Sequence, residues 1–444
     1  MKPSKDQVVK SAFSSFIGTA IEWYDFFLYG TAAALVFPKL FFPESDPLVG
    51  TLQSFATFTL GFVARPFGGI IFGNYGDKIG RKSMLVLTLL IMGISTALIG
   101  LLPTYENIGI WAPVLLIVLR LLQGIGVGGE WGGAALIAVE HAPKGKRGFY
   151  GSWPQMGVPG GLLLSTAVFT LFSSLPDEQF LSWGWRIPFL LSILLVGVGL
   201  FIRLRVMETP AFQKVKETGT EARMPILEVL KAHPKEVLQA MGARFAENGS
   251  FYIFSVFVLT YATEQLDLAK NMVLTGVTLA TAIGFFAMPL FAALSDRIGR
   301  RPVYMGGAAF TALFAFPFFW LLDTKSTLFI WLAIVLAMVF GHAAMYGPQA
   351  AFLSELFGTR VRYSGISIGA QLASVFAGGI APLVATSLIA WTGGKPWAVA
   401  VYLIFMSLIT LISVYWTSET YQKEISEERT NAKKEGFQRN TPAG

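Results

Sequence analysis

Twelve long apolar stretches constrain the fold of this chain more than any other feature. Each holds about 20 mainly apolar residues, the length that an α-helix needs to cross the roughly 30 Å hydrocarbon core of a bilayer. Charged residues make up only 14% of the 444 residues, well below the ~25% typical of soluble domains. We therefore expect an all-α membrane protein with twelve transmembrane helices. The stretches lie near residues 11–37, 50–74, 83–103, 111–139, 150–174, 185–204, 236–262, 271–294, 302–322, 328–353, 361–391 and 395–417.

The distribution of lysine and arginine predicts the orientation in the membrane. The net charge is +7, but the basic residues form short separated clusters, which argues for membrane topology and against a nucleic-acid-binding surface. The N-terminal sequence MKPSKDQVVK has no signal-peptide cleavage pattern. With that end inside, most basic residues fall on inner loops and tails. We expect a multi-pass inner-membrane protein with both termini in the cytoplasm.

The chain repeats two loop motifs. Residues 73–82 (GNYGDKIGRK) match residues 292–301 (AALSDRIGRR), and residues 140–147 (EHAPKGKR) match residues 355–362 (ELFGTRVR). Two matched pairs in the same order indicate two six-helix halves. The predicted units are an N-terminal half, a charged cytoplasmic linker, a C-terminal half and a disordered cytoplasmic tail without coiled-coil heptads, at residues 1–204, 205–235, 236–417 and 418–444.

These motifs carry a resemblance to a known family. The doubled G-x-x-x-D-[RK]-x-G-R-[RK] loop resembles the major facilitator superfamily, although Ala292 replaces the leading glycine of the second copy. The segments EWYDFFLYG, ARPFGG, GGEWGG and WGWRIPF, which begin at residues 22, 64, 128 and 183, are similar to the metabolite:proton symporter family. Within that family, the chain most resembles the shikimate-type transporters and their relatives of unassigned substrate. The resemblance implies the major facilitator fold and alternating access.

Charged residues inside the spans point to a function that needs them. Each costs about 2.5–3.5 kcal/mol at the centre of a membrane helix. Four carboxylates face three guanidiniums, so one negative charge is unbalanced if all are ionised. An unpaired carboxylate in a low dielectric can take up a proton near neutral pH, which is what a proton-coupled carrier requires. The seven residues are Glu22, Asp25, Arg65, Arg120, Glu130, Arg244 and Glu247.

We expect the proton-coupling residues to be Asp25, Arg120, Glu22 and Glu130. The resemblance implies that Asp25 corresponds to the first-helix aspartate that carries the proton in related sugar symporters. It likewise implies that Arg120 is the fourth-helix arginine that pairs with ionised Asp25 and is released when Asp25 is protonated. The alternative is a static buried pair that only fixes helix packing.

We expect Arg65 to bind a substrate carboxylate, because its planar guanidinium can hold a carboxylate with two hydrogen bonds. The alternative is a permanent salt bridge from Arg65 to Glu22 or Glu130. Arg244 and Glu247 are three residues apart on one helix face and are expected to pair with each other. The other predicted substrate-binding residues are Trp23, Tyr24, Trp131, Gln155, Asn248, Tyr252, His342, Tyr346 and Gln371, together with Arg244 and Glu247.

The two acidic and basic loop motifs predict a gate. We expect a switchable ion-pair gate, made of Asp77 and Arg81 in one half and of Asp296 and Arg300 in the other half. The alternative is that their basic residues only signal topology.

Together these features predict a proton-coupled symporter that imports a small organic acid, either shikimate-like or a di- or tricarboxylate. The chain has no Cys, three His and no phosphate-binding G-x-x-x-x-G-K-[ST] loop. We therefore expect no metal, no cofactor, no ATP and no enzymatic activity, so that a proton gradient supplies the energy. The expected partners are the substrate, the proton and the lipid bilayer, with no nucleic acid, and the carrier is expected to be a monomer. Two alternatives stay open. One is a proton- or Na⁺-coupled importer of a zwitterion such as proline or betaine, and the other is an uncoupled facilitator or sensor.

Overall fold

The computed structural model describes residues 5–45, 47–219 and 225–422, and these residues form helices and no strands. All twelve predicted spans are helical. Among the described residues, ten helices are long and apolar enough to cross a membrane by length and composition. The first and seventh spans are more polar, because they carry Glu22 and Asp25, and Arg244 and Glu247. The least apolar spans are therefore those that hold the buried charges.

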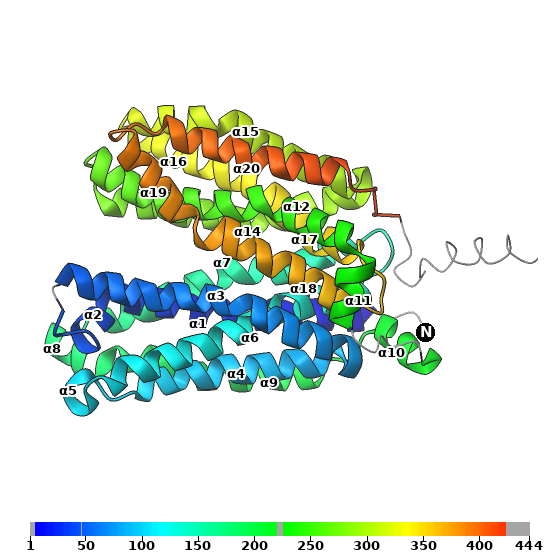
Figure 1. The fold of residues 1–444 in the computed structure, drawn as a ribbon, viewed down its shortest axis with the longest axis horizontal. Coiled ribbons are helices and arrows are strands. Elements are labelled where there is room, and N and C mark those ends of the chain that lie inside the picture. Colours follow the sequence, from blue (N-terminus) through cyan, green and yellow to red (C-terminus); the bar gives the residue numbers. More distant parts are fainter. Residues whose placement is uncertain (1–4, 46, 220–224, 423–444) are drawn as a thin grey trace, which may run out of the picture.

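The first six spans form one bundle, the lower part of the molecule in Figure 1. Short helices and one π-helical turn connect them. The spans are α1 (Lys5–Leu35), α3 (Pro47–Ile79), α4 (Arg81–Leu101), α6 (Trp111–His141), α7 (Arg147–Ser173) and α9 (Arg186–Leu204), and the connections are α2 (Phe37–Leu40), α5 (Tyr105–Ile108), α8 (Asp177–Gln179) and η1 (Phe180–Gly184).

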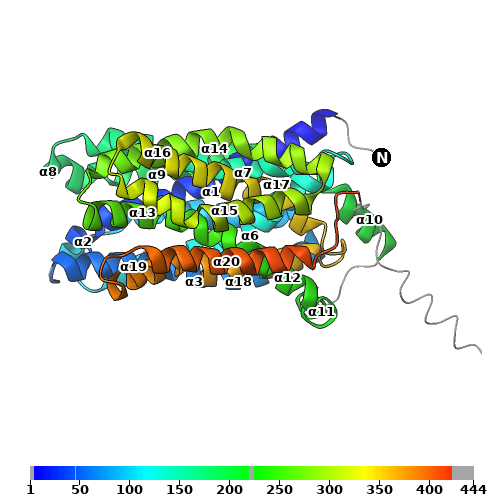
Figure 2. The same cartoon turned by 90° about the horizontal axis from the view of Figure 1, so that it is seen from above.

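The last six spans form the second bundle, which packs on the first mainly through α7 and α18 (Figures 1 and 2). Three of them are uninterrupted: α14 (Lys270–Ile298), α15 (Arg300–Asp323) and α20 (Trp397–Tyr415). The other three are each composed of several consecutive pieces. These pieces are α12 (Pro234–Tyr252), η2 (Ile253–Phe257), α13 (Val258–Thr260) and η3 (Tyr261–Gln265); α16 (Thr327–Leu336), η4 (Ala337–Ala343) and α17 (Ala344–Ser354); and α18 (Arg362–Ala373), η5 (Ser374–Gly379) and α19 (Ala381–Trp391).

In the second half, π-helical turns occur in spans 7, 10 and 11, whereas the corresponding first-half spans α1, α6 and α7 are continuous. Such turns are often found at functional sites. The two halves are therefore related by sequence repeats but differ in backbone geometry at equivalent positions. The side chains beside these turns are described below.

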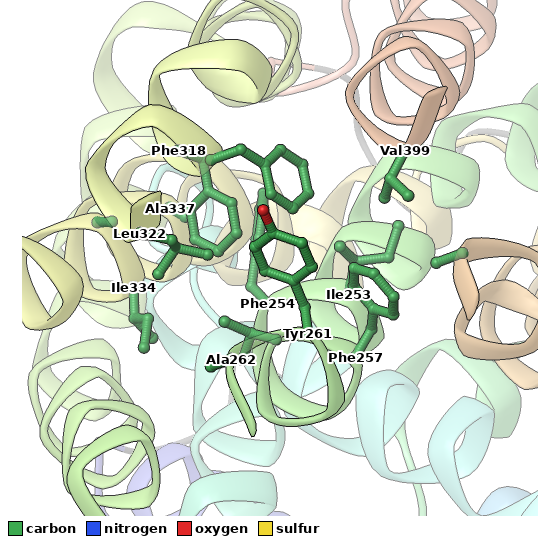
Figure 3. Close-up of a cluster of buried hydrophobic side chains, with 14 of the residues drawn as sticks. Ile253, Phe254, Phe257, Tyr261, Ala262, Phe318, Leu322, Ile334, Ala337 and Val399 are labelled. Carbon is green, nitrogen blue, oxygen red and sulfur yellow. The ribbon is translucent and has the colours of Figure 1, made fainter. Parts of the chain in front are cut away.

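Buried aromatic and aliphatic side chains hold the second bundle together (Figure 3). In a bilayer, helices associate through close packing of side chains, since the lipid is as apolar as the helix surfaces. The cluster joins the seventh span to α15, α16, η4 and α20. Its labelled members are Ile253, Phe254, Phe257, Tyr261, Ala262, Phe318, Leu322, Ile334, Ala337 and Val399.

Glycines allow the helices of the first half to approach closely. A Cβ atom added to Gly161 of α7 would lie 2.6 Å from the carbonyl oxygen of Ala20 on α1. On α6, Gly124 and Gly128 face the backbone of α3 in the same way, and Gly128 faces the carbonyl of Arg65. These small residues bring backbones together and fix the height at which Arg65 lies in the bundle.

We call the end of the bundle that carries the two loop motifs, residues 73–82 and 292–301, the motif end. The linker adds two short helices there, α10 (Pro210–Thr218) and α11 (Pro225–Ala232), while α2, α5 and α8 lie at the opposite end (Figures 1 and 2). Most of the tail that was expected to be disordered, residues 423–444, lies outside the described residues.

For residues 418–422 the expectation of disorder is wrong. The carboxylate of Glu419 accepts hydrogen bonds from the backbone N–H groups of Arg300 (2.9 Å) and Arg301 (3.1 Å), which begin α15. Thr420 is buried and donates to Glu355. Four N–H groups at the start of a helix lack partners within that helix, and the tail satisfies two of them. The polar, charged composition of the tail predicted disorder and gave no sign that Glu419 would cap a helix.

Candidate functional site

A cavity lies between the two halves and is lined by residues of both. It includes eight of the twelve residues predicted to bind substrate, together with three that were not predicted. The predicted residues are Trp23, Arg65, Arg244, Glu247, Asn248, Tyr252, His342 and Tyr346, and the additional ones are Val158, Phe251 and Ser374. Phe251, His342 and Ser374 lie next to or within the π-helical turns of the second half.

Arg65 enters the cavity from α3 and is surrounded by aromatic rings. Its guanidinium carbon lies 4.2 Å from the ring centroid of Phe62, 4.7 Å from that of Phe26 and 5.8 Å from that of Trp23. The Nε and Nη2 atoms have no hydrogen-bond partner among the described residues. Buried polar groups without partners are costly. Arg65 therefore lines the cavity while two of its buried guanidinium nitrogens lack an acceptor among the described residues.

The predicted pairing of Arg244 with Glu247 is confirmed. Arg244 Nε lies 3.6 Å from Glu247 Oε2, and the guanidinium lies 4.8 Å from the ring centroid of Trp131. Glu247 Oε2 also accepts from Gln349 Nε2 (2.8 Å). Glu247 Oε1 lies 3.7 Å from His342 Nδ1, so that one wall of the cavity is a linked polar network.

Aromatic rings complete the cavity wall. His342 stacks on Tyr346 with ring centroids 5.0 Å apart and lies 4.9 Å from the ring of Phe251. Asn248 Nδ2 donates to Ser374 Oγ at 3.1 Å. A small molecule in the cavity would therefore meet flat apolar surfaces beside charged and amide groups.

Four predicted binding residues do not line the cavity. Trp131 Nε1 donates to Gln155 Oε1 (2.7 Å), and Gln155 Nε2 donates to the carbonyl of Tyr346 in the other half (3.0 Å). Gln371 Nε2 donates across the halves to the carbonyl of Gly128 (3.0 Å). Trp131, Gln155 and Gln371 thus join the halves behind the cavity wall.

Tyr24 lies away from the cavity. Its hydroxyl donates to the carbonyl of Pro188 on α9 (2.7 Å), and its ring belongs to a buried cluster of the first half. On α1, Trp23 lines the cavity, while Tyr24, the next residue, points in a different direction.

The expected pair between Asp25 and Arg120 is not formed in this structure. Asp25 is completely buried and its Oδ1 accepts a hydrogen bond from Ser192, while Oδ2 has no hydrogen-bond partner among the described residues. Arg120 instead donates to Gln123 Oε1 (3.1 Å). Its guanidinium carbon lies 4.1 Å from the ring centroid of Tyr29. Asp25 and Arg120 are therefore held by different neighbours in this structure.

Sequence reasoning missed a buried arginine that changes the charge count. Arg203, at the end of the span at residues 185–204, was not counted among the buried charges, but the structure buries it, with an ion pair to Glu130 and a hydrogen bond to the carbonyl of Leu85. Thr88 Oγ1 also donates to Glu130 Oε2 (2.7 Å). Four buried carboxylates therefore face four guanidiniums, and the prediction of one unbalanced negative charge is wrong.

Glu22 has no such fixed partner. Arg65, Glu130 and Arg203 lie near it, but its Oε2 has no hydrogen-bond partner among the residues that the structure describes. Since Glu130 is paired with Arg203, the alternative of a permanent bridge between Arg65 and Glu130 does not hold. Glu22 and Asp25 are thus the two buried carboxylates of α1 with an unused oxygen.

At the motif end, the gate residues contact the other half through backbone groups. Asp77 accepts hydrogen bonds from the backbone N–H groups of Tyr363 (3.2 Å) and Ser364 (2.9 Å), in the first turn of α18. Arg81 lies 3.4 Å from Asp77 and donates to the carbonyl of Thr359 (3.0 Å). A carboxylate at a helix N-terminus is stabilised by the unpaired N–H groups and by the helix dipole.

The second motif repeats this arrangement. Asp296 accepts from the backbone N–H groups of Gly148 (2.8 Å) and Phe149 (2.9 Å) at the start of α7. Arg300 pairs with Asp296 at 2.7 Å and with Glu355 at 3.2 Å. In each motif the aspartate lies beside the arginine of its own half and also caps a helix of the opposite half.

The ion pairs that cross the halves come from the second repeated loop. Glu140 pairs with Arg362 at 2.8 Å, and Arg147 lies 3.7 Å from Glu355. The repeat of residues 140–147 and 355–362 marked this loop in the sequence. It did not show which acidic residue pairs with which basic residue. At the motif end the halves are therefore held together by two helix caps and by these two ion pairs across the interface.

Comparison with known proteins agrees with this architecture. The family model described as Major Facilitator Superfamily matches residues 15–382. The chain is 46% identical over 408 residues to a shikimate transporter of Escherichia coli (strain K12), covering 91% of this chain and 93% of that protein. It is 36% identical over 427 residues to a glycine betaine/proline/ectoine/pipecolic acid transporter of Dickeya dadantii (strain 3937), covering 94% and 84%.

A solved structure gives the same fold. The proton:xylose symporter bound to 6-bromo-6-deoxy-D-glucose superposes with a TM-score of 0.77 over 95% of this chain and 98% of that chain, at 16% identity. The relatives and the solved structures are transporters and not enzymes. Two six-helix bundles, a cavity between them, the repeated loop motifs and these matches lead to one conclusion: the chain is a multi-pass membrane transporter that belongs to the Major Facilitator Superfamily.

Proposed function

We propose that this transporter is a proton-coupled symporter of the inner membrane, with both termini in the cytoplasm, that imports a small organic acid by alternating access. The substrate occupies the cavity between the halves, and its carboxylate binds Arg65. The carrier works as a monomer and needs no bound cofactor, because the proton gradient supplies the energy.

The observation that carries this proposal is the state of Arg65. A guanidinium that lines a cavity and has two nitrogens without a protein acceptor is suited to a ligand with a carboxylate, which can accept two parallel hydrogen bonds. The rings of Phe62 and Phe26 stabilise the positive charge of Arg65 through cation–π contacts. These rings also limit the directions from which a ligand can approach.

Asp25 is the proposed proton carrier. It is completely buried and has no arginine or lysine within ion-pair distance among the described residues. A carboxyl group without a fixed cationic partner can gain and lose a proton as its surroundings change during transport. Ser192, which donates to Asp25, then holds the ionised form in place.

Alternating access requires that the closed motif end can open. The contacts of Asp77, Asp296 and the Glu140–Arg362 pair cross from one half to the other. They break together when the halves separate, since each lies on the same interface. The other state, with the motif end open to the cytoplasm, releases the substrate.

Import of a zwitterion is the second candidate. The betaine and proline carriers among the relatives favour it, as does the aromatic wall of the cavity, because rings bind quaternary amines. Glu247 could pair with an amino group, but Arg244, Gln349 and His342 already surround it. The acid therefore fits the unused groups better.

Uptake into proteoliposomes under an imposed inward proton gradient tests the proposal. The panel is shikimate, citrate, 2-oxoglutarate, benzoate, proline and betaine, each with and without a protonophore. We expect an acid to accumulate and the protonophore to abolish accumulation. Accumulation of a zwitterion alone would favour the second candidate, and equilibration without accumulation would make the protein a facilitator.

A pair of arginine variants links the uptake to the site. Arg65→Lys keeps the charge but loses the planar fork, so we expect the KM for the acid to rise at least tenfold. Arg205→Lys is the matched control, because Arg205 is exposed and only covers the ring of Phe201. Equal effects of both variants would make Arg65 a structural residue.

A further inference from the structure

A second, apolar cavity lies beside the substrate cavity, between α7 of the first half and α14 of the second. Its wall is almost entirely apolar. Val158, Pro159 and Leu162 come from α7, while Met288 comes from α14 and Met338 from η4. Thr281 Oγ1 already donates to the carbonyl of Val277 (2.8 Å), so the cavity offers almost no free hydrogen-bonding group.

Gly284 shows independently that this space is empty. It is buried on α14 and lines the cavity, yet a Cβ atom added to it would meet no atom within 4 Å. Most buried glycines of this chain lie against a neighbouring atom at much shorter distance. A buried backbone that faces nothing marks a real void in the packing.

The two cavities are neighbours. Val158, Phe251 and His342 line both of them. A molecule bound to Arg65 can therefore reach the second cavity by passing these three side chains. The combined space has a cationic polar part and an apolar part.

We propose that the second cavity is a subsite for the hydrocarbon part of the substrate. The transported acid is then a monocarboxylate with an apolar ring or branch, and not a compact polyanion. This inference rests on the proposed function of the first cavity and narrows its substrate class.

The physical reason is the cost of an empty apolar space. Apolar cavities stay dry and bind small hydrocarbons, because water finds no partners there. The walls also lack the dispersion contacts that a close-packed interior provides. A ring that enters the cavity gains these contacts and leaves water. A citrate-like ligand would instead bring charged groups beside Met288 and Met338 without partners, which is unfavourable.

Binding to the purified full-length protein in lipid nanodiscs tests the inference by calorimetry. The probes are cyclohex-1-ene-1-carboxylate, acrylate and citrate. Acrylate keeps the unsaturated carboxylate head group and lacks the ring. We expect the ring acid to bind at least about tenfold more tightly than either other acid, a difference of about 1.4 kcal/mol.

Gly284→Leu fills the second cavity from its own wall. We expect this variant to remove the advantage of the ring acid while the affinity for acrylate stays within about twofold. Gly306→Leu is the matched control, because Gly306 is exposed on α15 and faces open space. If Gly284→Leu does not fold, Met288→Gln replaces it, since an amide in the wall makes the cavity polar at similar volume.

The outcomes separate the inference from the proposed function. Three results would overturn the apolar subsite but leave an acid carrier. The wild type could bind all three acids with equal affinity, or bind citrate most tightly. Alternatively, the affinity for the ring acid could stay the same in both cavity variants. Failure of every acid in both nanodiscs and the uptake assay would overturn the proposed function as well.

Discussion

Removing the charge of Asp77 should open the motif end. In the closed structure its two carboxylate oxygens accept from the backbone N–H groups of Tyr363 and Ser364 at 3.2 and 2.9 Å, and Asp77 is 1% exposed. Asn has one carbonyl oxygen and no charge, so Asp77→Asn keeps at most one of the two hydrogen bonds. Arg81, 3.4 Å away, also loses its counter-charge.

The magnitude follows from these contacts. A hydrogen bond to a charged group contributes about 1.5–3 kcal/mol, and an anion at a helix N-terminus gains about 0.3–1 kcal/mol, up to ~2 kcal/mol where partly buried. Some of this loss is recovered by the remaining amide oxygen, so about 2 kcal/mol is a cautious total. Since 1.4 kcal/mol is a factor of ten, the open fraction should rise roughly thirtyfold.

The chain contains no Cys, so a single introduced thiol reports on opening without further substitutions. Ser367 on α18 is 1% exposed, and its hydroxyl lies close to Gly132 of the other half. In a Ser367→Cys background we expect Asp77→Asn to increase the rate of maleimide labelling by about thirtyfold. The rate follows the open fraction when opening is faster than labelling.

Asp6→Asn is the matched control. It removes the same charge from the same end of the molecule, but Asp6 forms only an exposed ion pair with Lys10. Its labelling rate should equal that of the parent. A change below about threefold for Asp77→Asn, or the same increase in both variants, would refute the capping argument.

Three further predictions concern the buried carboxylates and the close helix contact. Asp25→Asn should abolish uptake driven by a pH gradient while counterflow exchange stays measurable, and full gradient-driven uptake would remove Asp25 from proton coupling. Glu130→Leu leaves Arg203 buried without its partner, so the free energy of unfolding from thermal melts should fall by about 3–5 kcal/mol. Adding Arg203→Leu should recover most of this stability. A further loss of stability in the double variant would contradict the prediction. Gly161→Ala should cost about 1–3 kcal/mol by pushing α1 and α7 apart, whereas Gly197→Ala, which faces open space, should be neutral in the same melting assay.

The amino-acid sequence was sufficient for the spans, the two halves and most of the cavity residues. Each of these depends on information that is local in the chain. Hydropathy over about 20 residues defines a membrane helix, and a repeated loop motif relates the halves directly. A charged residue within an apolar span must face a cavity or a partner, which is why Arg65, Arg244 and Glu247 were correctly placed.

Partners of the buried charges could not be predicted in the same way. Arg203 stands at the end of its span and was not counted among the buried charges, but the packing of α9 on α4 brings it to Glu130. The expected Asp25–Arg120 pair is absent, because Ser192 and the rings around Arg120 occupy their surroundings. Which charges meet depends on the rotation of each helix about its axis.

The sequence by itself determined that this chain crosses a membrane as twelve helices in two related halves, because apolar length and repetition are properties of the chain alone. Only the tertiary structure decided that Asp77 and Asp296 cap helices of the opposite half, and that an apolar cavity adjoins Arg65. Those features arise where faces of distant segments meet. Their energies depend on distances of a few ångströms that no single segment encodes.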